Sequence, residues 1–200
     1  MKLVRVEYLF GEELARSDVQ LAQCLTEVRE AVARVTWPPD SESFRIRPVP
    51  KGNGVTPIKR DFQQHLAGRG WELERLPTPG SAVQRRAGPL DALRKLPDGR
   101  QVAAEWETGN ISSSHRALNK LTLALLDGDL AAGVLVLPSG NLYRYLTDRI
   151  GSYPELEPYF RLWRRAPIPG TCLAVFAVEH DSLDETVPLI PKGRDGNADK

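Results

Sequence analysis

The sequence predicts an α/β fold with a central mixed sheet flanked by helices. Segments in which apolar residues recur at helical spacing are interleaved with segments that have strand-like patterns. The continuous apolar run at 131–137 is typical of a fully buried, central strand. No Ser/Gly linker, internal repeat or low-complexity segment divides the chain. We therefore expect a single domain over residues 1–200, with a flexible tail from about residue 192.

The first predicted helix extends from Ser17 to about Val35. The sequence at 17–20 has the form of a capping box. Apolar residues recur along the helix at Val19, Ala22, Leu25, Val28 and Val32. This stripe predicts one face packed against a core.

The other elements follow from the same periodicities and from the turn and capping residues between them. They are an edge strand at 44–48, a helix that begins at Pro57 and carries Lys59, a strand at 71–76, a helix capped by the serines at 112–114, the buried strand at 131–137, helices at 142–149 and 154–163, and a strand at 172–178.

Two acidic residues are predicted to share one face of a strand. Residues 101–108 alternate, so successive side chains point to opposite faces. Glu105 and Glu107 then lie on one face, roughly 7 Å apart at their Cα atoms. The other face takes Val102, Ala104 and Trp106. The ordinary alternative is a solvated strand face, which for an isolated Glu-x-Glu would be favoured by roughly ten to one.

A third carboxylate is predicted to join them across a hairpin. The turn sequence at 97–99 precedes the strand, and residues 89–93 have the character of its partner, which brings Asp91 beside Glu105 and Glu107. Clustered carboxylates repel one another unless they are protonated or bridged by a hard cation. Mg²⁺ is the usual cation held by carboxylates, waters and phosphate oxygens. The cluster therefore predicts a metal-binding nuclease centre.

Runs of residues along nearly the whole chain match those of a known family. They lie at 53–55, 57–59, 88–91, 105–113, 115–116, 119–121, 145–149, 155–160 and 187–193. In these runs and their order, the sequence resembles the BamHI type II restriction endonucleases and, more distantly, their BglII relative. The resemblance implies a restriction-endonuclease-like fold of the PD-(D/E)xK type, and an enzyme that hydrolyses double-stranded DNA at a specific site.

For catalysis, the resemblance implies that Asp91, Glu105 and Glu107 form the active site and hold Mg²⁺ at the scissile phosphate. Metal-activated water would attack phosphorus in line with the leaving oxygen. A related nuclease pattern has lysine where this chain has Glu107, so this carboxylate would bind metal or accept a proton instead. Glu74 aligns with a further acidic residue of the BamHI site, although an exposed strand glutamate is nearly as good an interpretation.

For recognition, the resemblance assigns DNA contacts to residue types that suit base edges in the major groove, where Arg pairs with guanine, Asn with adenine and Asp with the cytosine amino group. The predicted readers are Asn110, Ser112, Arg116, Asp148 and Arg149, and Lys59 is a candidate for a phosphate contact. Their spacing implies a GGATCC-like palindrome. Taken singly, Asn110 and Ser112 have the alternative of helix caps, and the basic residues that of solvated surface charge.

A palindromic target has two-fold symmetry, so we expect a C₂ homodimer. The interface is predicted to use the helix at 114–125 and the segment 153–163, where Tyr159, Phe160 and Trp163 exceed what a solvated helix needs. The alternative is that these aromatic side chains are ordinary core. His115 is not needed as a base and is expected to pack or to face a phosphate.

The sequence departs from the BamHI pattern in two places. The hairpin between Asp91 and Glu105 is a few residues shorter, and little chain follows the matched run at 187–193. We expect the tail to be mobile in the free protein and to order on the minor-groove side of bound DNA, adding affinity more than base discrimination.

Composition alone leaves the function open. The net charge of +1 does not indicate a nucleic-acid binder. No run of about 18 apolar residues is present and the N-terminus lacks a signal-peptide pattern, so we expect a cytoplasmic protein without a membrane partner. Cys24 and Cys172 are the only cysteines, and both are expected to be reduced, packed thiols.

Two other functions compete with a sequence-specific endonuclease. A structure-directed DNA repair nuclease would cut wherever a flap or nick occurs, not at discrete sites. A non-catalytic DNA-binding protein on the same scaffold would be favoured had Asp91, Glu105 or Glu107 been replaced by an apolar residue, which is not the case.

Overall fold

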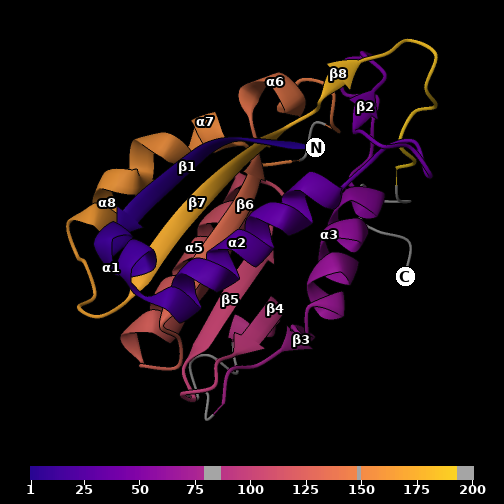
Figure 1. Ribbon diagram of the computed structural model, residues 1–200. Coiled ribbons are helices and arrows are strands. Elements are labelled where there is room, and N and C mark those ends of the chain that lie inside the picture. Colours follow the sequence, from indigo (N-terminus) through magenta and orange to yellow (C-terminus); the bar gives the residue numbers. More distant parts are fainter. Residues whose placement is uncertain (79–86, 148–149, 193–200) are drawn as a thin grey trace.

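A mixed six-stranded sheet forms the centre of the molecule (Figure 1). The structure is a computed structural model and describes residues 1–78, 87–147 and 150–192. Across the sheet the strands are β1 (Lys2–Phe10), β7 (Cys172–Glu179), β6 (Ala132–Pro138), β5 (Gln101–Trp106), β4 (Leu90–Lys95) and β3 (Glu72–Arg75). The pairs β5–β6 and β6–β7 are parallel, and the three outer pairs are antiparallel. The mixed sheet predicted from the sequence is confirmed.

The apolar run predicted to be a buried strand is β6. It pairs with β5 on one side and β7 on the other, and all seven of its residues are buried. A parallel strand covered on both faces favours an unbroken apolar run, because neither face meets water. The prediction of a central, buried strand is therefore confirmed.

Helices cover both faces of the sheet and bury two apolar layers (Figure 1). The first layer receives apolar side chains from α1 (Glu12–Ser17), α2 (Val19–Arg34), α3 (Thr56–Gly68) and α6 (Gly140–Tyr143). The second receives them from α5 (Ile111–Leu126), α7 (Tyr153–Leu156) and α8 (Phe160–Arg164), with the 3₁₀-helix η1 (Glu157–Tyr159) between the last two. A small parallel pair, β2 (Arg45–Ile46) with β8 (Ser182–Leu183), forms a separate sheet.

The elements β1 and α1 were not predicted. Strand β1 lies at the edge of the sheet, paired with β7, and several of its side chains are exposed. An edge strand needs no continuous apolar face, so charged residues interrupt its alternation and the strand signal is weak.

The caps predicted for two helices were wrong. Asp18 rather than Ser17 caps α2, because its carboxylate accepts hydrogen bonds from the backbone N–H groups of Gln20 and Leu21 at 3.0 and 3.1 Å. Asn110 caps α5, one position before the helix and ahead of the serines at 112–114. Asp and Asn cap a helix at least as well as Ser. In both cases a polar residue within two positions of the predicted serine has the extended backbone that a cap requires.

The helix predicted at 142–149 was too long, because α6 ends at Tyr143. The chain after it forms tertiary hydrogen bonds: Asn53 N–H donates to the Tyr145 carbonyl at 3.0 Å, and Thr147 N–H donates to the Asn53 carbonyl at 2.8 Å. These bonds use backbone groups that a longer helix would need. The helix predicted at 154–163 is instead three short pieces, α7, η1 and α8.

Both cysteines are free and buried, as the sequence predicts. Burial raises the pKa of each thiol, Cys24 and Cys172, to about 12. The thiols are therefore unreactive at neutral pH. No helix within 1–78, 87–147 and 150–192 is both long enough and apolar enough to cross a bilayer.

The Asp18 carboxylate joins the start of α2 to the β4–β5 hairpin through its ion pair with Arg100, at 2.7 Å. We predict that Asp18→Ala lowers the free energy of unfolding at pH 7 by about 1 kcal/mol or somewhat more, since it removes both the cap and the ion pair. Asp18→Asn keeps a capping oxygen and should lose less. Urea denaturation of the three proteins measures this.

The difference in the free energy of unfolding between wild type and Asp18→Ala should depend on pH. The Arg100 hydrogen bond lowers the pKa of Asp18 below its ordinary value of 3.8. The ionised carboxylate therefore stabilises the folded state above about pH 4, and this contribution is lost as the pH falls through the lowered pKa. An Asp18→Ala difference as large at pH 2 as at pH 7 would show that the carboxylate charge contributes nothing.

Candidate active site

The β4–β5 hairpin brings the first two predicted acidic residues together. The register pairs Ala92 with Ala104, so Asp91 lies next to Glu105 on the neighbouring strand. The Asp91 Oδ2 atom also accepts a hydrogen bond from Trp106 N–H at 2.9 Å, which ties this side chain to the end of β5. The other face of β5 packs into the first apolar layer through Val102, Ala104 and Trp106, as predicted.

A pocket of about 300 Å³ opens beside these strands. It contains most of the predicted site residues and several that were not predicted. Its lining consists of Lys59, Glu74, Ala87, Gly88, Pro89, Asp91, Glu105, Glu107, Ser113, Arg116, Ala117 and Lys120. The structure therefore brings together all four acidic residues singled out from the sequence, with Lys59 and Arg116. Their functional roles stay predictions.

Each of the two buried carboxylates in this pocket is paired with a lysine from a different helix. Lys59 Nζ of α3 lies 2.7 Å from Asp91 Oδ1, and Lys120 Nζ of α5 lies 2.6 Å from Glu105 Oε1. Lys120 also donates a hydrogen bond to the Pro89 carbonyl at 2.7 Å. Buried carboxylates require such partners because removing a charge from water is costly.

Lys120 was not predicted as a site residue, although the sequence carries a signal for it. On α5 it lies three residues after Ala117 and four before Ala124, and all three are buried. A lysine within the apolar stripe of an amphipathic helix is rare unless an acidic partner compensates it.

Burial and, to a lesser degree, the neighbouring Asp91 carboxylate together raise the pKa of Glu105 to about 8, against the opposing effect of Lys120. For Lys59, burial lowers the pKa, but the Asp91 carboxylate more than offsets this and the pKa lies above its ordinary value. Lys59 is therefore an ammonium group at neutral pH. Both pKa values are therefore raised, that of Glu105 chiefly by burial and that of Lys59 by the Asp91 carboxylate.

Glu107 lies just outside the strand predicted to carry it. Strand β5 ends at Trp106, and the Glu107 Oε1 atom accepts a hydrogen bond from Gly109 N–H at 2.5 Å. The Gly109 carbonyl in turn accepts from Gly151 N–H at 2.7 Å. A Cβ atom at Gly109 would lie 2.9 Å from the Glu107 carboxylate, so this turn needs a residue without a side chain. Glu107 is therefore positioned by the loop after β5.

Glu74 lies at the rim of the pocket in an uncommon backbone conformation. Its φ angle is 49°, in the left-handed region that L-residues seldom adopt and that occurs often at functional sites. The Gln63 side-chain amide donates to Glu74 Oε1 at 3.1 Å and to the Asp91 carbonyl at 3.4 Å. Gln63 thus connects Glu74 to the strand that carries Asp91.

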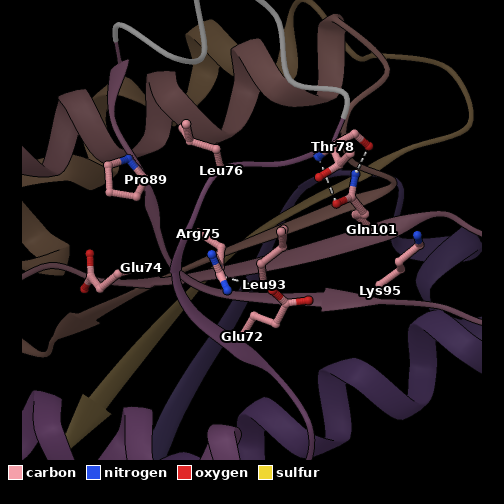
Figure 2. A pocket seen from close by; sticks show the side chains of 9 residues that line it. All are labelled: Glu72, Glu74, Arg75, Leu76, Thr78, Pro89, Leu93, Lys95 and Gln101. Atoms are coloured by element: carbon pink, nitrogen blue, oxygen red, sulfur yellow. Dashed lines mark hydrogen bonds and ion pairs between the residues drawn. The ribbon is translucent and has the colours of Figure 1, made fainter.

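Glu74 and Pro89 also line a second, neighbouring hollow of about 510 Å³ (Figure 2). Figure 2 shows Glu74 on the side of this hollow opposite the Gln101 amide, which is hydrogen-bonded to the backbone of Thr78. Of the three acidic residues predicted to bind metal, none lines this second hollow. The chemistry is therefore expected in the first pocket.

The donors of the first pocket suit a divalent cation in their chemistry. They are carboxylate oxygens, the ligands that Mg²⁺ prefers. Glu105 Oε1 is buried and, in the part of the chain that the structure describes, its polar contact is with the Lys120 ammonium group at 2.6 Å. Among the same residues, no three His, Cys, Asp or Glu side chains lie close enough together to hold a metal ion without moving. A metal ion bound at Asp91 or Glu105 would therefore have to share or replace the ammonium groups.

Three of the predicted DNA-contacting residues, Asn110, Ser112 and Arg116, lie at the start of α5. The Asn110 side chain accepts a hydrogen bond from Ser113 N–H at 3.1 Å, so it caps the helix, as the ordinary alternative proposed. Ser112 and Arg116 are exposed, and Arg116 lines the pocket. Asp148 and Arg149, together with the tail from about residue 192 except its first residue, lie outside the described residues.

The aromatic residues predicted at a subunit interface divide into two groups. Phe160 and Trp163 are buried in the second apolar layer, where the alternative of ordinary core holds. Tyr159 is exposed and contacts the His115 ring edge-on, with ring centroids 4.6 Å apart. His115 also stacks on Trp163 at 6.1 Å, so it packs between two aromatic rings.

Comparisons with known proteins agree with this geometry. The profile of the family described as "Restriction endonuclease BamHI" matches residues 1–197. The type II restriction enzyme OkrAI of Oceanobacter kriegii is 48% identical over 198 residues, which cover 99% of both chains. The type II restriction enzyme BamHI of Bacillus amyloliquefaciens is 34% identical over 200 residues, covering 96% of this chain and 92% of that enzyme.

Solved structures show the same fold at low sequence identity. The restriction endonuclease BglII in complex with a DNA 16-mer superposes with a TM-score of 0.63 at 8% identity, covering 90% of this chain and 79% of BglII. Free BglII superposes with a TM-score of 0.50 at 9% identity, covering 90% and 81%. The restriction-endonuclease-like fold implied by the sequence resemblance is confirmed.

The raised pKa of Glu105 predicts a pH dependence of stability in metal-free buffer. The folded state binds this proton more tightly than the unfolded state, whose ordinary pKa is 4.5. The free energy of unfolding should therefore fall as the pH rises from about 5 to about 8. Glu105→Gln has no proton to lose, so its stability curve should be flatter across this range.

Denaturant midpoints from pH 5 to pH 9 measure the effect. Glu72→Gln, a change at an exposed glutamate of β3, is the matched control and should leave the wild-type slope unchanged. Parallel curves for wild type and Glu105→Gln would contradict the raised pKa.

Proposed function

This chain belongs to the BamHI family of type II restriction endonucleases, and from that premise we propose that it cleaves double-stranded DNA at GGATCC with Mg²⁺ held by Asp91, Glu105 and Glu107. One observation carries the proposal: all three carboxylates line one pocket, together with Lys59, Arg116 and Lys120. Carboxylates for a cation beside basic groups for a phosphate make up the chemistry of a phosphodiesterase.

The residues of the pocket have different proposed roles. When bound, the ion would lower the pKa of the attacking water and neutralise charge on the leaving oxygen. Asp91 and Glu105, fixed on adjacent strands, would hold it. Glu107 makes no ion pair among the described residues, so its carboxylate is available as a further ligand or to accept the proton of the attacking water. Arg116, exposed at the pocket wall, faces the phosphate.

Recognition is proposed to come from the loop and helix that directly follow β5. Asn110, Ser112 and Arg116 lie at the start of α5, and Asp148 and Arg149 complete the set implied by the sequence. Capping of α5 by Asn110 uses its side-chain oxygen, which leaves the amide NH₂ to donate to a base or phosphate. A GGATCC site presents guanine, adenine and cytosine edges that suit these side chains.

A palindromic site is read most simply by a homodimer, and exposed apolar side chains on η1 and α8 support one. Tyr159 is 46% exposed and Leu162 is 60% exposed. Exposed apolar groups on a surface helix mark an interaction surface when they gather on one side. We predict that Leu162→Arg yields a monomer in sedimentation equilibrium. Leu183→Arg, a change at another exposed leucine, on β8, should leave the dimer intact.

The activity itself is tested by digesting a sequenced plasmid with the purified protein and Mg²⁺. We predict discrete fragments with ends at GGATCC, and none when a chelator replaces the metal. Cleavage dispersed over the plasmid, or directed to nicks and flaps, would favour a repair nuclease. Binding to the site with no cleavage under any divalent ion would favour a non-catalytic DNA-binding protein.

Glu105→Ala should abolish cleavage and keep specific binding, because it removes a metal ligand and leaves the base-reading side chains in place. A loss of at least about 100-fold in cleavage rate is expected. Glu72→Ala, at an exposed glutamate of β3, is the control and should cut normally. Gel-shift and cleavage assays on one oligonucleotide separate the two effects, and a Glu105→Ala enzyme that cuts at a wild-type rate would refute the assignment.

A further inference from the structure

The Lys59 side chain lines two adjoining pockets. Its ammonium group lies 2.7 Å from Asp91 Oδ1 inside the carboxylate pocket. The same residue also lines an adjoining hollow of about 550 Å³, together with Arg60 and Thr108. Its side chain is 28% exposed, whereas that of Asp91 is 9% exposed. The lysine therefore reaches from solvent inward to the carboxylate.

We propose that Lys59 is a switch between metal and DNA, an inference that rests on the proposed function. Without metal, its ammonium group neutralises Asp91 and holds this carboxylate in place. A divalent ion bound at Asp91 replaces the ammonium group, which then turns outward to a DNA phosphate. Metal binding and DNA binding are thereby coupled through one side chain.

Electrostatics makes simultaneous occupancy of Asp91 unfavourable. An ammonium group and a divalent cation on one carboxylate oxygen would lie within a few ångströms of each other in a partly buried pocket, where repulsion is weakly screened. The displaced lysine does not need to lose its proton, because it also lines the adjoining hollow, where Arg60 is exposed, and Arg116 is exposed at the first pocket. Those groups mark the side from which a phosphate approaches.

Lys120 is unsuited to the same role. Its side chain is 8% exposed, and it is held from two sides, by the Glu105 carboxylate and by the Pro89 carbonyl. It has no comparable path to solvent and does not line the outer hollow. Of the two lysines in the pocket, Lys59 is the one able to exchange a carboxylate for a phosphate.

The first test measures calcium binding by calorimetry in the absence of DNA. Lys59→Met removes the competitor for Asp91 and should bind Ca²⁺ about tenfold more tightly than wild type. Arg60→Met, a loss of the same charge from the next, exposed position, should change calcium affinity by less than about twofold. Lys59→Gln replaces Lys59→Met if the latter does not fold, as judged by circular dichroism.

The second test measures binding of a GGATCC duplex with a chelator and with Ca²⁺. Lys59 is engaged by Asp91 in the first condition, so Lys59→Met should leave affinity unchanged there and lower it about tenfold with calcium. For Arg60→Met, the loss of affinity for the duplex should be equally large with the chelator and with calcium. Lys59→Met behaving like Arg60→Met, or binding Ca²⁺ no more tightly than wild type, would overturn the switch and make Lys59 a fixed phosphate contact.

Failure of the switch and failure of the proposed function give different results. Calcium binding by the wild type that is lost in Asp91→Ala supports the metal site on which the switch depends. A wild type that binds no divalent ion and cuts no DNA overturns both. A wild type that binds metal and cuts at GGATCC, while Lys59→Met fails the tests above, overturns the switch alone.

Discussion

The antiparallel pairing of β4 with β5 is the constraint on which the site depends. Side chains alternate across a strand, so a shift of one residue in this register would turn Asp91 or Glu105 into the opposite apolar layer. Ala92 and Ala104 face each other in this pair and both pack into the first apolar layer, so the register keeps Asp91 and Glu105, one position away on each strand, out of that layer. The hydrogen bond from Trp106 N–H to Asp91 adds a second, local restraint. The hydrophobic pattern of a hairpin thereby sets the position of the two carboxylates that are proposed to bind the metal.

Burying Asp91 and Glu105 beside the core destabilises their charged forms. Lys59 and Lys120 compensate by forming ion pairs with them. Asp91 and Glu105 are both buried, and close to each other each raises the energy of the other's charged form. Lys59 and Lys120 offset that repulsion in the absence of metal, so the pocket is arranged for a cation before one binds. A site optimised for stability alone would carry apolar residues here, because a buried ion pair is often less stable than a well-packed apolar replacement. The charged cluster therefore supports the proposed chemistry more than it supports a role in folding.

Much of this was predictable from the sequence, and the parts that were not share a cause. The alternation at 101–108 and the apolar run at 131–137 predicted β5, β6 and the faces of β5, because strand periodicity depends only on neighbours in sequence. The caps at Asp18 and Asn110, the early end of α6 and the pairing of Lys120 with Glu105 depend on contacts between segments far apart in the chain, or on which of two adjacent polar residues meets an extended backbone. Local patterns do not contain that information.

Glu107 is held by the same short loop that leads into α5, so the proposed metal ligand and the proposed base contacts are close together in the chain. The Glu107 carboxylate accepts a hydrogen bond from Gly109 N–H, and the Gly109 carbonyl accepts one from Gly151 N–H. In the sequence, Gly151 follows shortly after Asp148 and Arg149. The loop after β5 therefore has a proposed metal ligand at one end and the α5 cap, Asn110, at the other. Only Thr108 and Gly109 separate Glu107 from Asn110, which is proposed to contact a base edge, so a movement of this loop is expected to change the position of both side chains. Short connections of this kind allow binding energy from the correct sequence to align a catalytic group, which is how specificity appears in the rate as well as in affinity.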